Sequence, residues 1–188
     1  MIITEAGKTL ELLGDPHLGR QFIHGVPLHR RGEREKMVWQ DFTKSLNNTR
    51  ADYHVCMGDL FDKWTVSYDL ILDTANAYIK AGIDHPDTLF VVLRGNHDTT
   101  RNLEAKAAFD VFEQLIRRQF NLLVVTETIK LGRLLFVPWD PILDTAEVVS
   151  RYTDIEAAFG HWDTEFSKHN MVPTQAGIPT LYTGHVHK

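Results

Sequence analysis

The sequence predicts an α/β fold in which mixed β-sheets form a sandwich flanked by helices. Short apolar runs of strand length alternate along the chain with stretches whose apolar residues recur at helical spacing. This alternation is typical of βαβ units, which form parallel sheets covered by helices. Two later apolar runs meet in a polar turn at residues 130–132 and predict a hairpin, so part of the pairing should be antiparallel.

Each element can be placed from its own pattern. In chain order, we expect a strand at 8–15, a helix at 34–48, a strand at 52–59, a helix at 67–82, a strand at 87–98, a helix at 102–119, strands at 121–131 and 132–140, a helix at 141–152, and strands at 154–163 and 178–187. Gly82 should stop the second helix, and Asn102 is a plausible N-cap for the third.

Length and composition indicate one soluble globular domain. The 188 residues are enough for one sizeable core, and 43% of them are apolar. No apolar run approaches the roughly 20 residues needed to span a bilayer, and the N-terminus does not resemble a signal peptide. Cys56 is the single cysteine, which excludes an internal disulfide and fits a reducing compartment, so we expect a cytoplasmic protein.

Metal-binding and proton-transferring residue types follow five of the apolar runs, in the blocks GDPH, GD, GNHD, GH and GHVH. The candidate residues are Asp15, His17, Asp59, Asn96, His97, Asp98, His161, His185 and His187. Each alone could be an ordinary turn or cap residue. Sites in open α/β sheets form beyond the carboxyl ends of strands, so their recurrence at five strand ends favours one metal site. A glycine close to each block permits a tight backbone approach.

The donor types indicate which ions would bind. Imidazoles, carboxylates and one amide oxygen suit first-row divalent ions, foremost Mn²⁺, with Fe²⁺, Zn²⁺, Co²⁺ and Ni²⁺ also possible. Seven candidate ligands are too many for one ion and suit two ions that share a carboxylate. Two ions about 3.5–4 Å apart are a phosphoryl-transfer arrangement. The net charge of −5 argues mildly against a dedicated nucleic-acid binder, although bound cations would offset it locally.

The five blocks, in this order from Asp15 to His187, resemble the calcineurin-like metallophosphoesterase superfamily. The resemblance implies an α-β-β-α layered fold and attack on a phosphodiester by a metal-bridging hydroxide. It implies that Asp59 bridges the two ions, that His97 contacts the phosphate and protonates the leaving group, and that Asp98 orients His97. It also implies two sets of further ligands: Asp15, His17 and His187 for the first ion, and Asn96, His161 and His185 for the second. His169 is an alternative to His161, which we favour because it ends an apolar strand.

Within this superfamily, GDPHLG and GDLFD are most similar to the SbcD-type DNA repair nucleases. Between these blocks lies a local basic cluster, from which Arg20, Arg30, Arg31 and Arg34 are candidate contacts to nucleic-acid phosphates. The cluster could equally be a solvated loop whose arginines pair with Glu33 and Glu35. The SbcD-type proteins continue into a DNA-capping domain and a segment that binds an ATPase partner. We therefore expect residues 1–188 to be a single catalytic domain without a capping domain, either as a short stand-alone form or as a C-terminally truncated core.

The functional hypothesis is a dimetal phosphodiesterase, with DNA or RNA as its substrate. A small-molecule phosphatase or a cyclic-nucleotide-type phosphodiesterase remains the alternative among enzymes. A non-catalytic metal-binding module is a third possibility, which the complete set of ligand positions and the presence of His97 argue against.

Overall fold

The computed structural model describes residues 1–100, 105–140, 142, 144–163, 170–174 and 176–185. It contains two β-sheets. The first has the order β1 (Ile2–Glu5), β2 (Lys8–Leu13), β3 (Tyr53–Cys56), β4 (Leu89–Leu93), β5 (Leu122–Val125). The second has the order β6 (Ile129–Leu131), β7 (Leu134–Val137), β8 (Ala157–Gly160), β9 (Thr180–Thr183). In each sheet the first strand is antiparallel to its neighbour and all later pairs are parallel.

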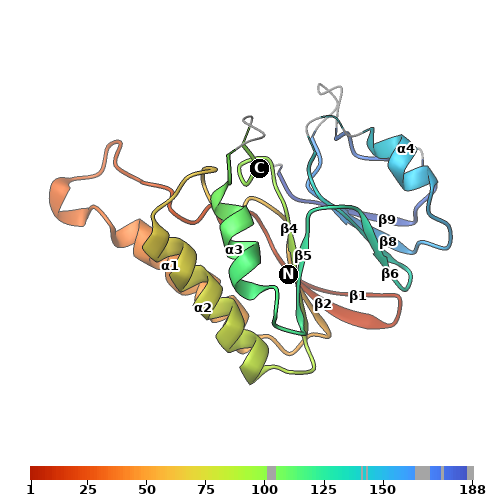
Figure 1. Cartoon of the computed structure of the whole chain (residues 1–188), viewed down its shortest axis with the longest axis horizontal. Helices are drawn as coiled ribbons and strands as arrows, with labels where there is room; N and C mark the ends of the chain where they lie inside the picture. Colours follow the sequence, from red (N-terminus) through yellow and green to blue (C-terminus); the bar gives the residue numbers. More distant parts are fainter. Residues whose placement is uncertain (101–104, 141, 143, 164–169, 175, 186–188) are drawn as a thin grey trace.

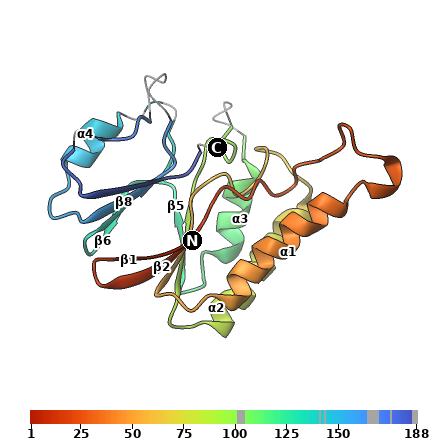
Figure 2. The same ribbon diagram turned by 180° about the vertical axis from the view of Figure 1, so that it is seen from behind.

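The helices cover the outer faces of the two sheets (Figures 1 and 2). They are α1 (Glu33–Asn48), α2 (Tyr68–Asp84), α3 (Ala108–Ile116) and α4 (Thr145–Ser150). The short 3₁₀ helix η1 (Leu28–Arg30) lies in the loop before α1 and covers neither sheet. Helices α1, α2 and α3 lie against the first sheet, and α4 lies against the second. The predicted α-β-β-α sandwich is therefore confirmed. No helix in the described part of the chain is long and apolar enough to cross a membrane.

Alternating side chains of the strands build three separate layers of core. In β4, Phe90 and Val92 pack among the helices, whereas Val91 and Leu93 point into the space between the sheets. In β7, Phe136 belongs to that same middle layer. Successive strand residues point to opposite faces, so a strand that is apolar throughout must be buried on both sides. The middle layer fixes how the two sheets sit on each other.

Four sequence predictions need correction. Gly82 does not stop the second helix: it is buried inside α2, which continues to Asp84. The stretch 121–131 is not one strand: β5 belongs to the first sheet and β6 to the second, and the hairpin is formed by β6 with β7. The N-terminal strand β1 was not predicted, because its turn places Ala6 in the left-handed region (φ 50°) that usually selects glycine or asparagine.

The third helix begins at Ala108: the Asp110 carboxylate accepts the N–H of the N-cap residue Ala107 at 2.8 Å, and the N–H of Ala108 donates to the carbonyl of Trp64 at 2.7 Å. Asn102 lies outside the described residues.

A buried histidine lies in β3, remote from the strand ends. The ring of His54 is fully buried, its Nε2 lies 2.9 Å from the Ser45 hydroxyl, and that hydroxyl donates to Glu11. With the Ser45 proton directed at Glu11, Nε2–H donates to the Ser45 oxygen, and burial disfavours a second proton on the ring. Burial lowers the pKa of His54 from 6.5 to about 4.

This depressed pKa predicts a loss of stability in mild acid. The unfolded chain takes up a proton at His54 below pH 6.5, while the folded chain resists protonation down to about pH 4, so stability falls as the pH drops through this window. Between pH 7.5 and 5.5 we expect the free energy of unfolding to fall by about 1 kcal/mol more in the wild type than in His54→Gln. Denaturant titrations at both pH values measure this difference, with the exposed His29→Gln as control. Equal pH dependence in wild type and His54→Gln would contradict the prediction.

Candidate metal centre

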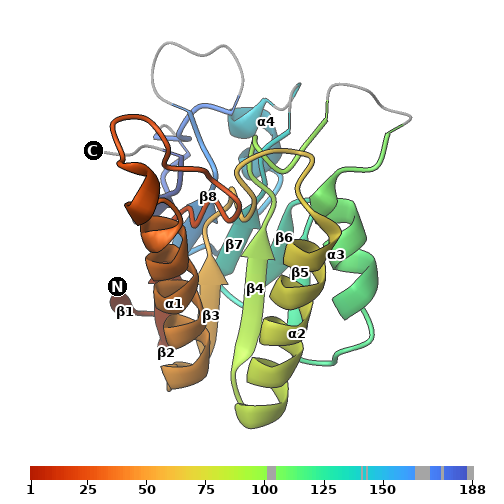
Figure 3. The same cartoon turned by 90° about the vertical axis from the view of Figure 1, so that its left-hand side faces the viewer.

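Parallel pairing continues beyond the ends of β2 and β3 and brings the first two candidate blocks together. The N–H of His17 donates to the carbonyl of Asp59 at 3.0 Å, and the N–H of Leu18 donates to Leu60 at 2.9 Å. Figure 3 shows β3 and β4 running toward the same edge, where the loops that follow them meet. His17 and Asp59 therefore leave the first sheet side by side.

Asp59 stands at the centre of the site, with its two carboxylate oxygens facing different histidines. Oδ2 lies 3.6 Å from Nε2 of His17, and Oδ1 lies 3.4 Å from Nε2 of His161, which comes from the second sheet. Oδ1 also accepts the backbone N–H of His97 at 2.8 Å. The Asp59 side chain is buried, yet its pKa is lowered, because the hydrogen bond and charge of His161 outweigh the effect of burial. The carboxylate form is therefore the stable one.

His161 is completely buried and is fixed by contacts at both ring nitrogens. Nδ1 lies 3.0 Å from the carbonyl of Met57, and Nε2 lies 2.9 Å from Oδ1 of Asn96. Burial alone would lower the pKa of His161, but the neighbouring Asp59 and Asp15 reverse this and raise it. With Nδ1–H donating to the carbonyl, three electron-pair donors converge at Nε2: the ring nitrogen, the Asn96 oxygen and an Asp59 oxygen. A metal ion, or the proton of an imidazolium, would satisfy all three donors.

Asp15 and His185 complete the described cluster from the ends of β2 and β9. Oδ2 of Asp15 accepts the backbone N–H of His185 at 2.7 Å, and the rings of His161 and His185 lie 5.0 Å apart. His187, the remaining predicted ligand, and the alternative His169 lie outside the described residues. The other six predicted ligands are brought together from five separate loops.

Three of these residues adopt backbone angles that side chains other than glycine rarely adopt. His17, Asp59 and His185 have φ values of 44°, 46° and 73°. Such left-handed residues cost about 1–3 kcal/mol each and are concentrated at functional sites. The chain thus turns sharply at three ligand candidates, which aims their side chains at a common point.

The predicted glycines permit close approach at two critical places. A Cβ on Gly58 would lie 2.1 Å from Nδ1 of His161, and a Cβ on Gly95 would lie 2.2 Å from both the backbone nitrogen and Oδ1 of Asp59. Real Cβ contacts are never this short. Any side chain at Gly58 would push the second sheet's histidine away, and any side chain at Gly95 would displace Asp59.

His97 lines the mouth of the cluster, and its neighbours differ from those expected. Its Nδ1 lies 2.5 Å from the carbonyl oxygen of Asp62, whose carboxylate lies 3.7 Å from Nδ1 of His17. Asp98 does not contact the His97 ring: it is buried, and its oxygens accept the N–H groups of Leu60, Phe61 and Gly95. The prediction that Asp98 orients His97 is therefore wrong. The contact is made by Asp62, the last residue of the GDLFD block, which the prediction left out.

Burial and hydrogen bonding shift the pKa of the Asp98 carboxyl in opposite directions. Its burial raises the pKa of the carboxyl to about 7, although three N–H donors favour the charged form. Its role is structural: it ties the GDLFD loop to the GNHD loop, so that the two ligand-bearing segments are held in register.

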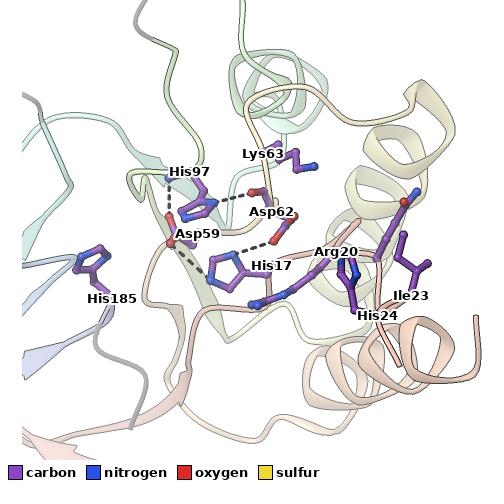
Figure 4. Close-up of a pocket in the computed structure, with 10 residues that line it drawn as sticks. His17, Arg20, Ile23, His24, Asp59, Asp62, Lys63, His97 and His185 are labelled. Carbon is purple, nitrogen blue, oxygen red and sulfur yellow. Dashed lines mark hydrogen bonds and ion pairs between the residues drawn. The ribbon is translucent and has the colours of Figure 1, made fainter. Parts of the chain in front are cut away.

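An open cavity of about 500 Å³ lies over this cluster, lined by Asp59, His97 and His185 at one side and by basic residues at the other (Figure 4). Of the four predicted substrate-binding arginines, only Arg20 lines it. Arg34 stacks on Phe22 at 4.3 Å, and Arg30 pairs with Glu33 at 3.0 Å. Arg30 and Arg31 belong to η1 and its C-cap, in the loop that projects beyond α1 (Figure 1).

The donor spacing fits metal ions. Two atoms that each lie about 2.1 Å from one ion are separated by about 3–4 Å. The contacts of Asp59 with His17 and His161, at 3.6 and 3.4 Å, are long for hydrogen bonds and fall in this range. Donor atoms within 4.8 Å of one another define the groups Asp15–His17–Asp59 and Asp59–His161–His185, which share Asp59. A third group, His17–Asp62–His97, lies beside them.

The family model that the chain matches describes proteins with a dinuclear metal site. Residues 12–188 match the family model described as calcineurin-like phosphoesterase, and the chain belongs to this family, whose members are metal-dependent hydrolases with a dinuclear divalent centre. Among solved structures, the chain is similar to the nuclease MPE of Pseudomonas putida, at 16% identity and a TM-score of 0.40, over 77% of this chain and 68% of that one. No curated protein sequence shows a significant match.

Substitution of Gly95 tests the packing around Asp59. In Gly95→Ala the new methyl group collides with the Asp59 backbone, and we expect a loss of about 1–3 kcal/mol in the free energy of unfolding, measured by denaturant titration in EDTA. Gly14→Ala is the matched control, because a Cβ at Gly14 meets nothing within 4 Å and that backbone angle is ordinary. If the two variants are equally stable, Asp59 is not packed as described.

Proposed function

We propose that this chain hydrolyses phosphodiester bonds of nucleic acid with two divalent metal ions, of which Mn²⁺ is the first candidate. The observation that carries the dimetal part is the position of Asp59, whose two oxygens face two separate groups of donors. Asp15 and His17 would hold one ion, together with His187. Asn96, His161 and His185 would hold the other. When bound, such ions polarise the phosphoryl oxygens and lower the pKa of a coordinated water.

The chain's own residues contribute positioning and proton transfer. Nδ1 of His97 is engaged by the Asp62 carbonyl, which fixes the plane of the ring and leaves Nε2 as the nitrogen for exchange with the substrate. His97 lines the cavity, so Nε2 is the position from which a proton can pass to the leaving oxygen. Asp62 positions both His17 and His97, and Asp98 holds the loop from which Asp62 projects.

The basic residues support a polyanionic substrate. Arg20 lines the cavity beside the cluster, and Arg31 and Arg34 follow on the same connection between β2 and the body of α1. The chain as a whole is acidic, so one arginine at the cavity and further arginines along the segment that leads away from it favour contact with successive phosphates of a nucleic-acid backbone. A small-molecule phosphomonoester carries one phosphate and would not need basic residues beyond the metal cluster.

Removal of the bridging carboxylate tests the metal centre. We expect Asp59→Ala to lose at least one of two bound Mn²⁺ ions in equilibrium dialysis, because each ion loses a ligand. Asp41→Ala, at an exposed position in α1, should retain both. Two ions per chain in Asp59→Ala would contradict the bridging assignment.

Removal of His97 tests the chemistry. With Mn²⁺, we expect the wild type to cleave bis-p-nitrophenyl phosphate and DNA faster than p-nitrophenyl phosphate. His97→Ala should lower diester turnover by about 10²–10⁴-fold while metal content is retained. The exposed His29→Ala is the control. Turnover of the monoester with intact DNA and RNA would exclude the nuclease function and favour a small-molecule phosphatase.

A further inference from the structure

Lys63 was not among the predicted site residues, yet it lines the same cavity as His97 and Arg20. It follows Asp62, which contacts both His17 and His97. One peptide unit separates their Cα atoms by about 3.8 Å, so the backbone of Lys63 is fixed at the edge of the cluster. The backbone of Arg20 is fixed similarly, because its N–H donates to the carbonyl of His17 at 3.1 Å. Two cations are thus built into the rim.

These two cations have no carboxylate partner within the described part of the chain. The two acidic neighbours make other contacts: Asp62 faces His17, and Glu35, which also lines the second cavity, accepts the N–H of Phe22 through Oε1 at 2.8 Å. Glu35 Oε2 has no hydrogen-bond partner among the described residues and forms no ion pair with Arg20 or Lys63. Other basic residues of the chain do form ion pairs, such as Lys80 with Asp84 and Arg133 with Glu156. Unpaired cations beside a phosphoesterase centre are suited to a second anion.

The space beside them is large enough for more substrate. A second cavity, of about 440 Å³, shares Arg20, Gln21, Asp62 and Lys63 with the first and continues to Thr65 and Ser67. In Figure 4, Lys63, Arg20 and His24 lie on the far side of Asp59 and His17 from His185. The cations therefore stand where the first cavity opens into the second, and not over the cluster itself.

We propose that Arg20 and Lys63 form a subsite for the phosphate next to the scissile one, so that the preferred substrate is a nucleotide chain with at least two phosphates. This proposal rests on the proposed nuclease function. It assigns Lys63 a role in substrate choice, and it predicts that a second phosphate, rather than a second base, accelerates cleavage. The amide of Gln21 and the hydroxyls of Thr65 and Ser67, which line the second cavity, would contact the sugar and the next part of the nucleotide backbone.

Three dinucleotides test this subsite in the presence of Mn²⁺. The probes are the thymidine dinucleotide with one internal phosphodiester, the same molecule with an added 5′-phosphate, and the same molecule with an added 3′-phosphate. We expect one of the phosphorylated forms to exceed the unphosphorylated dinucleotide by about tenfold or more in kcat/KM. Lys63→Ala and Arg20→Ala should each reduce this ratio severalfold, and the double variant should bring it close to one.

Two further variants and a binding measurement separate charge from structure. Lys63→Arg should keep most of the ratio, and Lys44→Ala, an exposed lysine on α1, should keep all of it. Calorimetric titration with phosphorylated dinucleotides that carry an uncleavable methylphosphonate linkage should show the same ranking of affinities. A ratio near one in the wild type, with the dinucleotide still cleaved, overturns the subsite and leaves the nuclease function standing. A high ratio that neither variant lowers places the second phosphate elsewhere and also overturns it. If DNA is cleaved but none of the dinucleotides is, the subsite is overturned and the nuclease function stands; if DNA and RNA also stay intact, both proposals are overturned.

Discussion

The structure of the site depends on the contact between Asp59, at the end of the first sheet, and His161, at the end of the second. Neither sheet holds a complete set of donors, so the site exists only when the two sheets are correctly placed. The apolar layer between the sheets sets that placement, and Gly58 allows the His161 ring to come within reach. Misplacement of a donor by about an ångström would already be too much for ligand distances near 2.1 Å. Packing in the middle of the sandwich is thus a condition for the chemistry at its edge.

Because donors from two sheets must converge on one site, the backbone is strained at three of the candidate ligands. His17, Asp59 and His185 occupy left-handed backbone angles that isolated residues of these types avoid. They are held there by backbone pairing beyond the strands and by Asp98, which accepts three N–H groups from two loops. Buried hydrogen bonds to a carboxylate are among the stronger ones in proteins, so they can offset a few kcal/mol of local strain. The geometry of the site therefore depends on supporting residues such as Asp98 as much as on the candidate ligands themselves.

Much of the fold and of the candidate site could be predicted from the sequence, because apolar runs and their polar ends are local patterns. The prediction failed where tertiary contacts decide the outcome. The apolar pattern of residues 121–131 predicts one strand. Only the packing of the two sheets shows that the chain passes from the first sheet to the second within this stretch. The resemblance to the superfamily implies that Asp98 orients His97, whereas the Asp98 side chain turns inward to backbone amides. The role of Asp62 and the position of Lys63 depend on how a loop folds back, which spacing alone does not encode.

The most direct test of a bridged two-ion centre is anomalous diffraction from crystals of the chain grown or soaked with Mn²⁺. The structure predicts two peaks about 3.5–4 Å apart, one beside Asp15 and His17 and one beside Asn96 and His161, with Asp59 between them. A single peak, or a peak confined to the group His17–Asp62–His97, would contradict the bridging role of Asp59 and with it the proposed mechanism.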